Sequence, residues 1–314
     1  MERRKKMEIR QFTYVNMVAE CGSMTKAAAK LFITQPALSN YISKLEEELG
    51  TKLFDRSVTP MKLTFSGEKY LEHARTVMMQ IDNMEREIRD ITNHQTGRLR
   101  LGFPNERIIY MLPALLPVFH EKYPGVRIET NNAPGVRLLD FLAAGDVDFV
   151  FLPGWEKRKG IVSHPISHEE LILVAKKGYI PDECLLDSKM RIFNWDHISD
   201  FPLFTLKKGH ALRSSLDLLC ERTGKIPNIC METHSNMLSC RLAAQGLGVA
   251  LVPEISMEIL KRDLDVEWYH LLECPVTWDV NIYYREDAYL GTMERDLIQM
   301  AEDVFGKRRL WKGV

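Results

Sequence analysis

Residues 23–67 constrain the fold most strongly, because two short helical patterns and the turn between them are followed by a basic segment. Ser23 has the hydroxyl that caps a helix, and the alanine-rich stretch after it predicts the first helix. Gln35 and Pro36 start the second helix, since proline is tolerated in a first turn, and Gly50 predicts its end. This spacing is typical of a helix-turn-helix, which places its second helix in a DNA groove.

The second predicted helix has two faces. Leu38, Ile42, Leu45 and Leu49 recur every three or four residues, which predicts the buried stripe of an amphipathic helix. The other face carries small polar side chains that can reach base edges when the start of the helix lies in the major groove. The DNA contacts expected from the two helices are Thr25, Gln35, Pro36, Ser39, Asn40, Ser43 and Lys44.

A short basic segment follows the second helix. Lys52, Arg56 and Lys62 flank a turn at Thr59 and Pro60, so a hairpin here is expected to bind phosphate and to supply affinity rather than base reading. The acidic run 46–48 would repel phosphate, which orients the start of the helix toward DNA. The pattern leaves one alternative open, a helical hairpin on the surface of an enzyme, with its polar face only solvated.

These motifs resemble the winged helix-turn-helix of LysR-type transcriptional regulators. The shared elements are GS-x-T-x-AA, QPALS, LE-x-x-LG, LF-x-R and LT-x-x-G. Two positions differ: Asn40 stands where the family usually has a basic residue, and Thr59 where it has a second wing arginine. The resemblance implies an α/β protein with an N-terminal all-α winged helix-turn-helix (1–66), a long linker helix (67–95) and a two-lobed, periplasmic-binding-protein-like effector domain (96–314).

The heptad pattern of the predicted linker helix indicates self-association. Apolar residues recur at intervals of four and three from Tyr70 to Ile91, the 3.5-residue period of a coiled coil. The expected dimerisation residues are Ala74, Val77, Ile81, Met84, Ile88 and Ile91. A single helix lying on a domain surface is the alternative. The family resemblance implies a dimer or a tetramer.

From residue 96 onward, short apolar runs alternate with helical patterns, which predicts an α/β domain with a mostly parallel sheet. Its first lobe is expected at 96–172 and 272–314, and its second at 173–271. RLAAQGLGVALVP at 241–253 matches the family closely, with Gly246 and Gly248 in a helix-to-strand turn. Two crossings between lobes predict a hinge.

In such sheets, ligands bind beyond the carboxyl ends of the strands, where helices begin. Arg107, Lys207, Lys208 and His210, together with helix N-termini, suit an organic anion, although each could equally be an ordinary cap or surface charge. Mapped onto the family, the expected effector-binding residues are Asn105, Glu106, Arg107, Asn132, Thr205, Lys207, Gly209, His210, Ser235 and Asn236.

Composition agrees with a DNA-binding end on a larger body. Residues 1–66 contain eleven Lys and Arg against seven Asp and Glu, while the whole chain has a net charge of -1. The six cysteines form no Cys-x-x-Cys pair, and no apolar run is long enough for a membrane helix, so we expect a cytoplasmic protein without membrane contact. Residues 1–6 precede Met7, so either Met1 or Met7 could be the native start.

The sequence shows little sign of catalysis. His164 and His168 have metal-like i, i+4 spacing, but Pro165 disfavours the helix that this spacing requires. Neither a GxxxxGK phosphate loop nor a GxSxG motif occurs, so we expect neither enzyme activity nor a metal or cofactor. The expected partners are double-stranded promoter DNA, a small-molecule effector, a second copy of the chain and, for an activator, RNA polymerase. The rival interpretation is a cytoplasmic two-lobed solute-binding or enzymatic α/β protein with an incidental helical N-terminal domain.

Overall fold

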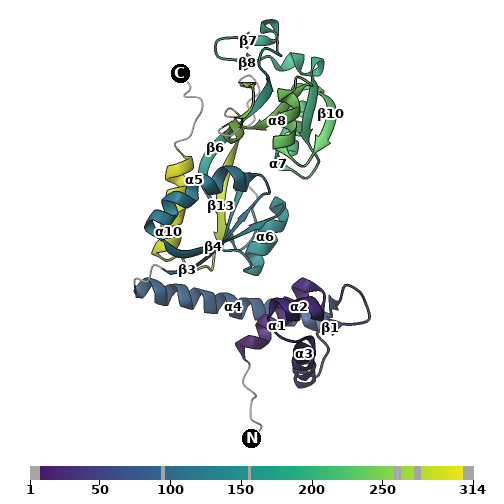
Figure 1. Ribbon diagram of the computed structural model, residues 1–314, viewed down its shortest axis with the longest axis vertical. Helices are drawn as coiled ribbons and strands as arrows, with labels where there is room; N and C mark the ends of the chain where they lie inside the picture. The colour runs from purple at the N-terminus through teal and green to yellow at the C-terminus, as the bar shows by residue number, and fades with distance from the viewer. Residues whose placement is uncertain are drawn as a thin grey trace. The chain divides into compact units, whose positions relative to one another are not determined.

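The computed structural model describes residues 8–92, 96–154, 157–257, 260, 263–271 and 277–306 (Figure 1). The chain divides into two compact units, Met1–Thr92 and Asn93–Val314, and each is described by itself. The two candidate start residues, Met1 and Met7, and the predicted end of the linker at 93–95 lie outside the described residues.

The first unit is a three-helix domain with a two-stranded hairpin and a long helix. Its elements are α1 (Ile9–Cys21), α2 (Met24–Lys30), α3 (Gln35–Leu49), β1 (Phe54–Asp55), β2 (Lys62–Leu63) and α4 (Phe65–Ile91). Ser23 Oγ accepts a hydrogen bond from Lys26 N, which confirms the predicted cap of α2. Gly50 ends α3 in the left-handed conformation, as predicted.

The core of this unit contains most of the predicted apolar stripe of α3. Leu38, Ile42 and Leu45 are buried, but Leu49 was wrongly assigned to the stripe, because it is 37% exposed in the last turn. Gly67 fixes the start of α4, since a Cβ there would overlap the carbonyl oxygen of Leu53. The hairpin and the first turn of α4 are therefore packed together.

Helix α4 is continuous across the predicted heptads. Ala74 is buried and Ile81 is half-buried, so neither presents a fully open surface. The remaining positions are exposed: Val77 by 41%, Met84 by 52%, Ile88 by 53% and Ile91 by 74%. An apolar stripe on a charged helix therefore faces outward in this single chain.

The second unit consists of two α/β lobes. Lobe I contains β3 (Thr96–Phe103), α5 (Arg107–Lys122), β4 (Gly125–Asn132), α6 (Gly135–Ala144), β5 (Phe149–Pro153) and α10 (Thr292–Phe305). Lobe II contains η1 (Asp182–Cys184), β7 (Leu185–Asp187), β8 (Ile192–Phe193), η2 (Trp195–Asp200), β9 (Pro202–Leu206), α7 (Ala211–Thr223), β10 (Asn228–Thr233), α8 (Asn236–Ala244), β11 (Val249–Pro253), η3 (Glu254–Ser256) and β12 (Val266–Tyr269).

Two long strands, β6 (Ile161–Lys176) and β13 (Thr277–Arg285), connect the lobes. The strand order is β10-β9-β11-β6-β13-β5-β3-β4, with β12 also paired to β6. The flanks are parallel, as predicted, but the prediction of a mostly parallel sheet was wrong at the centre. There β6 pairs antiparallel with β11, β13 pairs antiparallel with β5, and β6 and β13 pair antiparallel with each other, because the chain leaves lobe I on one strand and returns on the other.

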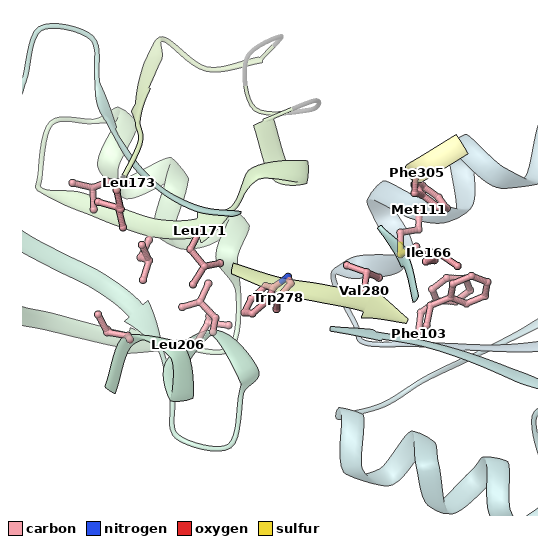
Figure 2. Close-up of a cluster of buried hydrophobic side chains, with 14 of the residues drawn as sticks. Phe103, Met111, Ile166, Leu171, Leu173, Leu206, Trp278, Val280 and Phe305 are labelled. Carbon is pink, nitrogen blue, oxygen red and sulfur yellow. The ribbon is translucent and has the colours of Figure 1, made fainter. Parts of the chain in front are cut away.

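The lobes share one hydrophobic core (Figure 2). Figure 2 shows Leu171, Leu173 and Leu206 on the lobe II side, Phe103 and Phe305 among those on the lobe I side, and Trp278 on β13 between the two groups. In lobe I, α5 and α10 cover one face of the sheet and α6 covers the other (Figure 1). These layers leave the starts of several helices at the junction of the lobes.

Candidate DNA-binding surface and effector pocket

The predicted DNA-contacting side chains of the first unit lie on its surface. Thr25, Gln35, Pro36, Asn40 and Lys44 are exposed, and Ser39 and Ser43 are half-exposed. Thr34 Oγ1 accepts a hydrogen bond from Ala37 N and so caps α3. The start of α3, with its remaining free N–H groups, is available to a phosphate.

Glu46 is buried beneath this surface, which sequence reasoning missed. Its Oε1 accepts hydrogen bonds from Leu53 N at 2.9 Å and Phe54 N at 3.3 Å. Its Oε2 binds Lys52 Nζ at 3.1 Å and Arg56 Nη2 at 3.3 Å. Glu46 was predicted to repel phosphate, but its side chain is inaccessible and instead holds the first strand of the hairpin.

Two of the three predicted wing cations, Arg56 and Lys62, differ in environment. Arg56 also donates to Ser43 Oγ at 3.3 Å, so this hairpin side chain bonds to two residues of α3 while 41% of it stays exposed. Lys62 is exposed on β2, directly opposite Asp55. Two hydrogen bonds from Ser57 and, more weakly, the charge of Lys62 lower the pKa of Asp55.

A cavity of about 480 Å³ lies between the lobes of the second unit. Four helices of the described chain begin at its wall, since Arg107, Gly135, Ala211 and Asn236 are the first residues of α5, α6, α7 and α8. None of the four has an acidic residue in its first turn. The dipoles of these four helices therefore direct partial positive charge toward the cavity.

Arg107 contributes less to this positive charge than the sequence predicts. Its guanidinium donates to both carboxylate oxygens of Glu169, at 2.9 and 3.0 Å, and both side chains are buried. Trp278 Nε1 donates to the same carboxylate at 3.0 Å. This bidentate pair neutralises the arginine and ties α5 to β6 and β13, so Arg107 shapes the wall rather than offering a free charge.

Glu106 is the one acidic side chain among the lining residues of the described cavity. It precedes α5 in lobe I, and its Oε2 accepts a hydrogen bond from Asn236 N, the first residue of α8 in lobe II, at 2.6 Å. Ser235 caps the same helix by accepting from Leu238 N at 3.1 Å. A carboxylate from one lobe therefore already binds the helix start of the other.

Two imidazoles face each other at the lobe II side of the cavity. His210 Nε2 lies 3.0 Å from His234 Nδ1, a distance that requires one ring to donate and the other to accept. Burial lowers the pKa of His210, and His234 lowers it further, while Glu106 opposes this shift. The pair therefore favours a state in which His210 is neutral.

Six of the ten predicted effector-binding residues line the cavity, namely Asn105, Glu106, Arg107, Gly209, His210 and Asn236. The lining does not include the other four: Asn132 lies at the end of β4, Thr205 is buried in β9, Lys207 N bonds Thr233 O, and Ser235 caps α8.

Sequence reasoning missed most of the apolar lining. The additional residues include Pro104, Pro134, Val136, Leu152, Pro153, Leu206, Leu212, Pro253, Trp278 and Tyr283. Pro153 and Pro253 end β5 and β11, so the rule of carboxyl ends could have found them. Trp278 and Tyr283 could not be found that way, because β13 reaches the cavity through a long-range pairing.

The remaining sequence signals lead elsewhere. His164 and His168 lie on β6, where they contact Glu302 and Asp279 respectively, and no helix forms around Pro165. Within the described ranges, no group of three or more His, Cys, Asp or Glu side chains is arranged to hold a metal. In the same part of the chain, no helix has the length and apolar character needed to cross a membrane.

An exposed helix-turn-helix surface, together with a two-lobed domain that encloses a cavity, defines a DNA-binding regulator with an effector-binding domain. Residues 9–68 match the family described as "Bacterial regulatory helix-turn-helix protein, lysR family", and residues 92–306 match the "LysR substrate binding domain". The chain belongs to the LysR family of transcriptional regulators. These matches are to regulators and not to enzymes.

Individual relatives agree with this assignment. The uncharacterized HTH-type transcriptional regulator YybE of Bacillus subtilis is 30% identical over 79% of this chain and 83% of YybE. A full-length OxyR from Pseudomonas aeruginosa has a TM-score of 0.74 at 21% identity, covering 96% of this chain and 95% of that one. CbnR, solved in complex with its target DNA, has a TM-score of 0.64 at 21% identity, covering 95% and 100% of the two chains. Both structures support the fold.

Proposed function

We propose that this regulator binds promoter DNA as an oligomer and that a small organic anion in the interlobe cavity controls this binding. The convergence of four helix starts on one cavity carries the proposal, because such starts attract negative charge. Lys208, from the lobe II side, adds a cationic side chain to the lining. The many apolar lining residues suit the carbon skeleton of an organic acid.

The surface of α3 is proposed to read sequence, and the hairpin to bind phosphate. Gln35 and Ser39 lie on the first two turns of α3 and are accessible. Truncating either to alanine should reduce discrimination between operator and random DNA by about 1 to 3 kcal/mol if it makes a good base contact. Lys62→Ala should instead weaken binding to all sequences alike and reduce its salt dependence. A loss confined to one base position would show that Lys62 reads sequence.

We assign oligomerisation to α4 within a three-part organisation of 1–66, 67–95 and 96–314. The exposed apolar positions Val77, Met84, Ile88 and Ile91 support pairing with a second copy. Pairing would set the spacing of DNA half-sites, so that each helix-turn-helix of the oligomer binds one half-site of the same operator. Action in the cytoplasm, and contact with RNA polymerase if the protein activates, follow from the same proposal.

The test measures binding of the full chain to the DNA upstream of its own gene, by fluorescence anisotropy at fixed salt, with and without a panel of small organic acids. We expect at least one acid to change the affinity, and the DNA to change the affinity for that acid by the same factor. Retained DNA affinity after deletion of residues 1–66 would contradict the DNA-binding assignment. A neutral compound acting better than every acid would contradict the anion.

A further inference from the structure

Glu106 joins lobe I to the start of α8 in lobe II, and the role assigned to it rests on the proposed binding of an anion in the cavity. We propose that the Glu106 carboxylate is a built-in occupant of the site at the start of α8, and that an anionic effector binds there by exchanging with it. The exchange would break a direct contact between the lobes. Glu106 would thus set both the affinity for anions and the link between binding and lobe movement.

The geometry of the contact supports this role. Glu106 Oε2 lies 2.6 Å from Asn236 N, a short distance of the kind that charge-assisted hydrogen bonds have. The two residues are 130 positions apart and belong to different lobes, so the bond exists only while the lobes are close. A carboxylate at a helix start is also favoured by the helix dipole.

The surroundings show that the position suits a negative group rather than Glu106 alone. His210, His234 and Lys208 line the same cavity, and Glu106 is the single acid among the lining residues described. The side-chain oxygen Oδ1 of Asn236 is buried without a hydrogen-bond partner in the described structure. A ligand that carries a hydroxyl or amine beside its carboxylate could satisfy this oxygen while replacing Glu106 at Asn236 N.

Glu106 occupies this position without an arginine of its own. Arg107, the adjacent cation, is fully engaged by Glu169 in a bidentate pair, and so it gives Glu106 no second anchor. A tethered carboxylate with one strong hydrogen bond can be displaced by a free carboxylate that makes additional contacts. The same reasoning predicts that weak anions leave the wild-type protein unchanged.

The test uses chemical rescue in the full chain. Glu106→Ala removes the side chain beyond Cβ, a CH2–COO⁻ group that acetate matches in size and charge. We expect the amide of Asn236 to exchange with solvent about tenfold to 100-fold faster in this variant, as measured by hydrogen exchange of α8 peptides. Sodium acetate should restore protection in Glu106→Ala but not affect wild type, with sodium chloride matching ionic strength.

Two further variants complete the experiment. Glu121→Ala removes the same charge from the exposed far end of α5 and should change neither α8 exchange nor its response to acetate. Glu106→Gln fills the same space without charge, so it should give a smaller acceleration and no acetate response, and it remains informative if the alanine variant does not fold.

Unchanged α8 exchange in both Glu106 variants would overturn the proposal, as would an equal acetate effect on wild type. These readouts do not involve DNA. Acetate rescue without any effect of organic acids on promoter binding would therefore refute the proposed function while leaving the Glu106 contact standing. An effect of organic acids on promoter binding without acetate rescue would refute the role of Glu106 while leaving the proposed function standing.

Discussion

Replacing Glu46 tests how the DNA-binding unit holds its hairpin. The side chain is inaccessible, and it is the acceptor for two buried backbone N–H groups, those of Leu53 and Phe54. Glu46→Ala leaves both donors without their partner. Lys52 and Arg56 lose a partner as well, but their side chains are 69% and 41% exposed, so water compensates them.

The magnitude follows from these contacts. A buried donor left without a partner costs about 1 to 3 kcal/mol, and the bond to Phe54 N, at 3.3 Å, is the weaker of the two. We therefore expect Glu46→Ala to destabilise the unit by about 2 to 4 kcal/mol. Glu46→Gln keeps an amide oxygen for the backbone donors and should cost only about 1 to 2 kcal/mol. Glu47→Ala, one residue along and exposed, should stay within about 0.5 kcal/mol of wild type.

Hydrogen exchange of α1 to α3 peptides in the full chain measures this effect. Tryptophan fluorescence does not report on the unfolding of this unit, because all five tryptophans lie beyond residue 92. The expected destabilisation corresponds to roughly 30-fold to 1,000-fold faster exchange for Glu46→Ala. Equal exchange in the Glu46 and Glu47 alanine variants would refute the reasoning. Glu46→Gln should also release Lys52 and Arg56 to bind phosphate. The slope of the logarithm of the DNA-binding constant against the logarithm of the salt concentration should then become steeper by about 0.9 for each new phosphate contact.

Three further outcomes are expected. Phe32 follows Leu31, the C-cap of α2, at φ +56°, where glycine is usual, and it is 95% exposed, so Phe32→Gly should stabilise the first unit by about 1 kcal/mol in urea titrations followed by hydrogen exchange. Val77→Glu should lower the mass in analytical ultracentrifugation; an unchanged mass would return α4 to the role of a surface helix. Because burial and His234 lower the pKa of His210, against the charge of Glu106, the folded protein binds this proton less readily than the unfolded chain. Stability should therefore fall as pH drops below 6.5, and wild type should lose more melting temperature than His210→Gln between about pH 7.5 and 5.5. Equal losses would show that His210 does not titrate unfavourably.

Local patterns predicted the helices well because caps and periodicity act over a few residues. The Ser23 hydroxyl caps the start of α2, and Gly50 ends α3 in the left-handed conformation. The apolar stripe of α3 from Leu38 to Leu45 is buried. Leu49 was wrong because the last turn of α3 has little to pack against. The central antiparallel strands were also outside the reach of local patterns, since their pairing depends on how the chain crosses twice between lobes.

The charged site residues were harder to predict for a single physical reason. A basic side chain in the sequence looks available, but its partner is chosen by the fold. Arg107 is paired with Glu169, 62 residues away, and Arg56 with Glu46, ten residues away. Both acids are buried, and burial strengthens each ion pair. The composition of the chain does not reveal which acid lies beside which base.

The same logic underlies the proposed link between anion binding and lobe position. Neutralising Arg107 with Glu169 leaves the helix starts and Lys208 as the main positive features of the cavity. Of these, the start of α8 belongs to lobe II, while the carboxylate that binds it belongs to lobe I. An incoming anion that removes Glu106 from Asn236 replaces an interlobe contact with a ligand contact. Because β6 and β13 are the strands that join the lobes, the proposed exchange would shift the balance between lobe arrangements through these two strands.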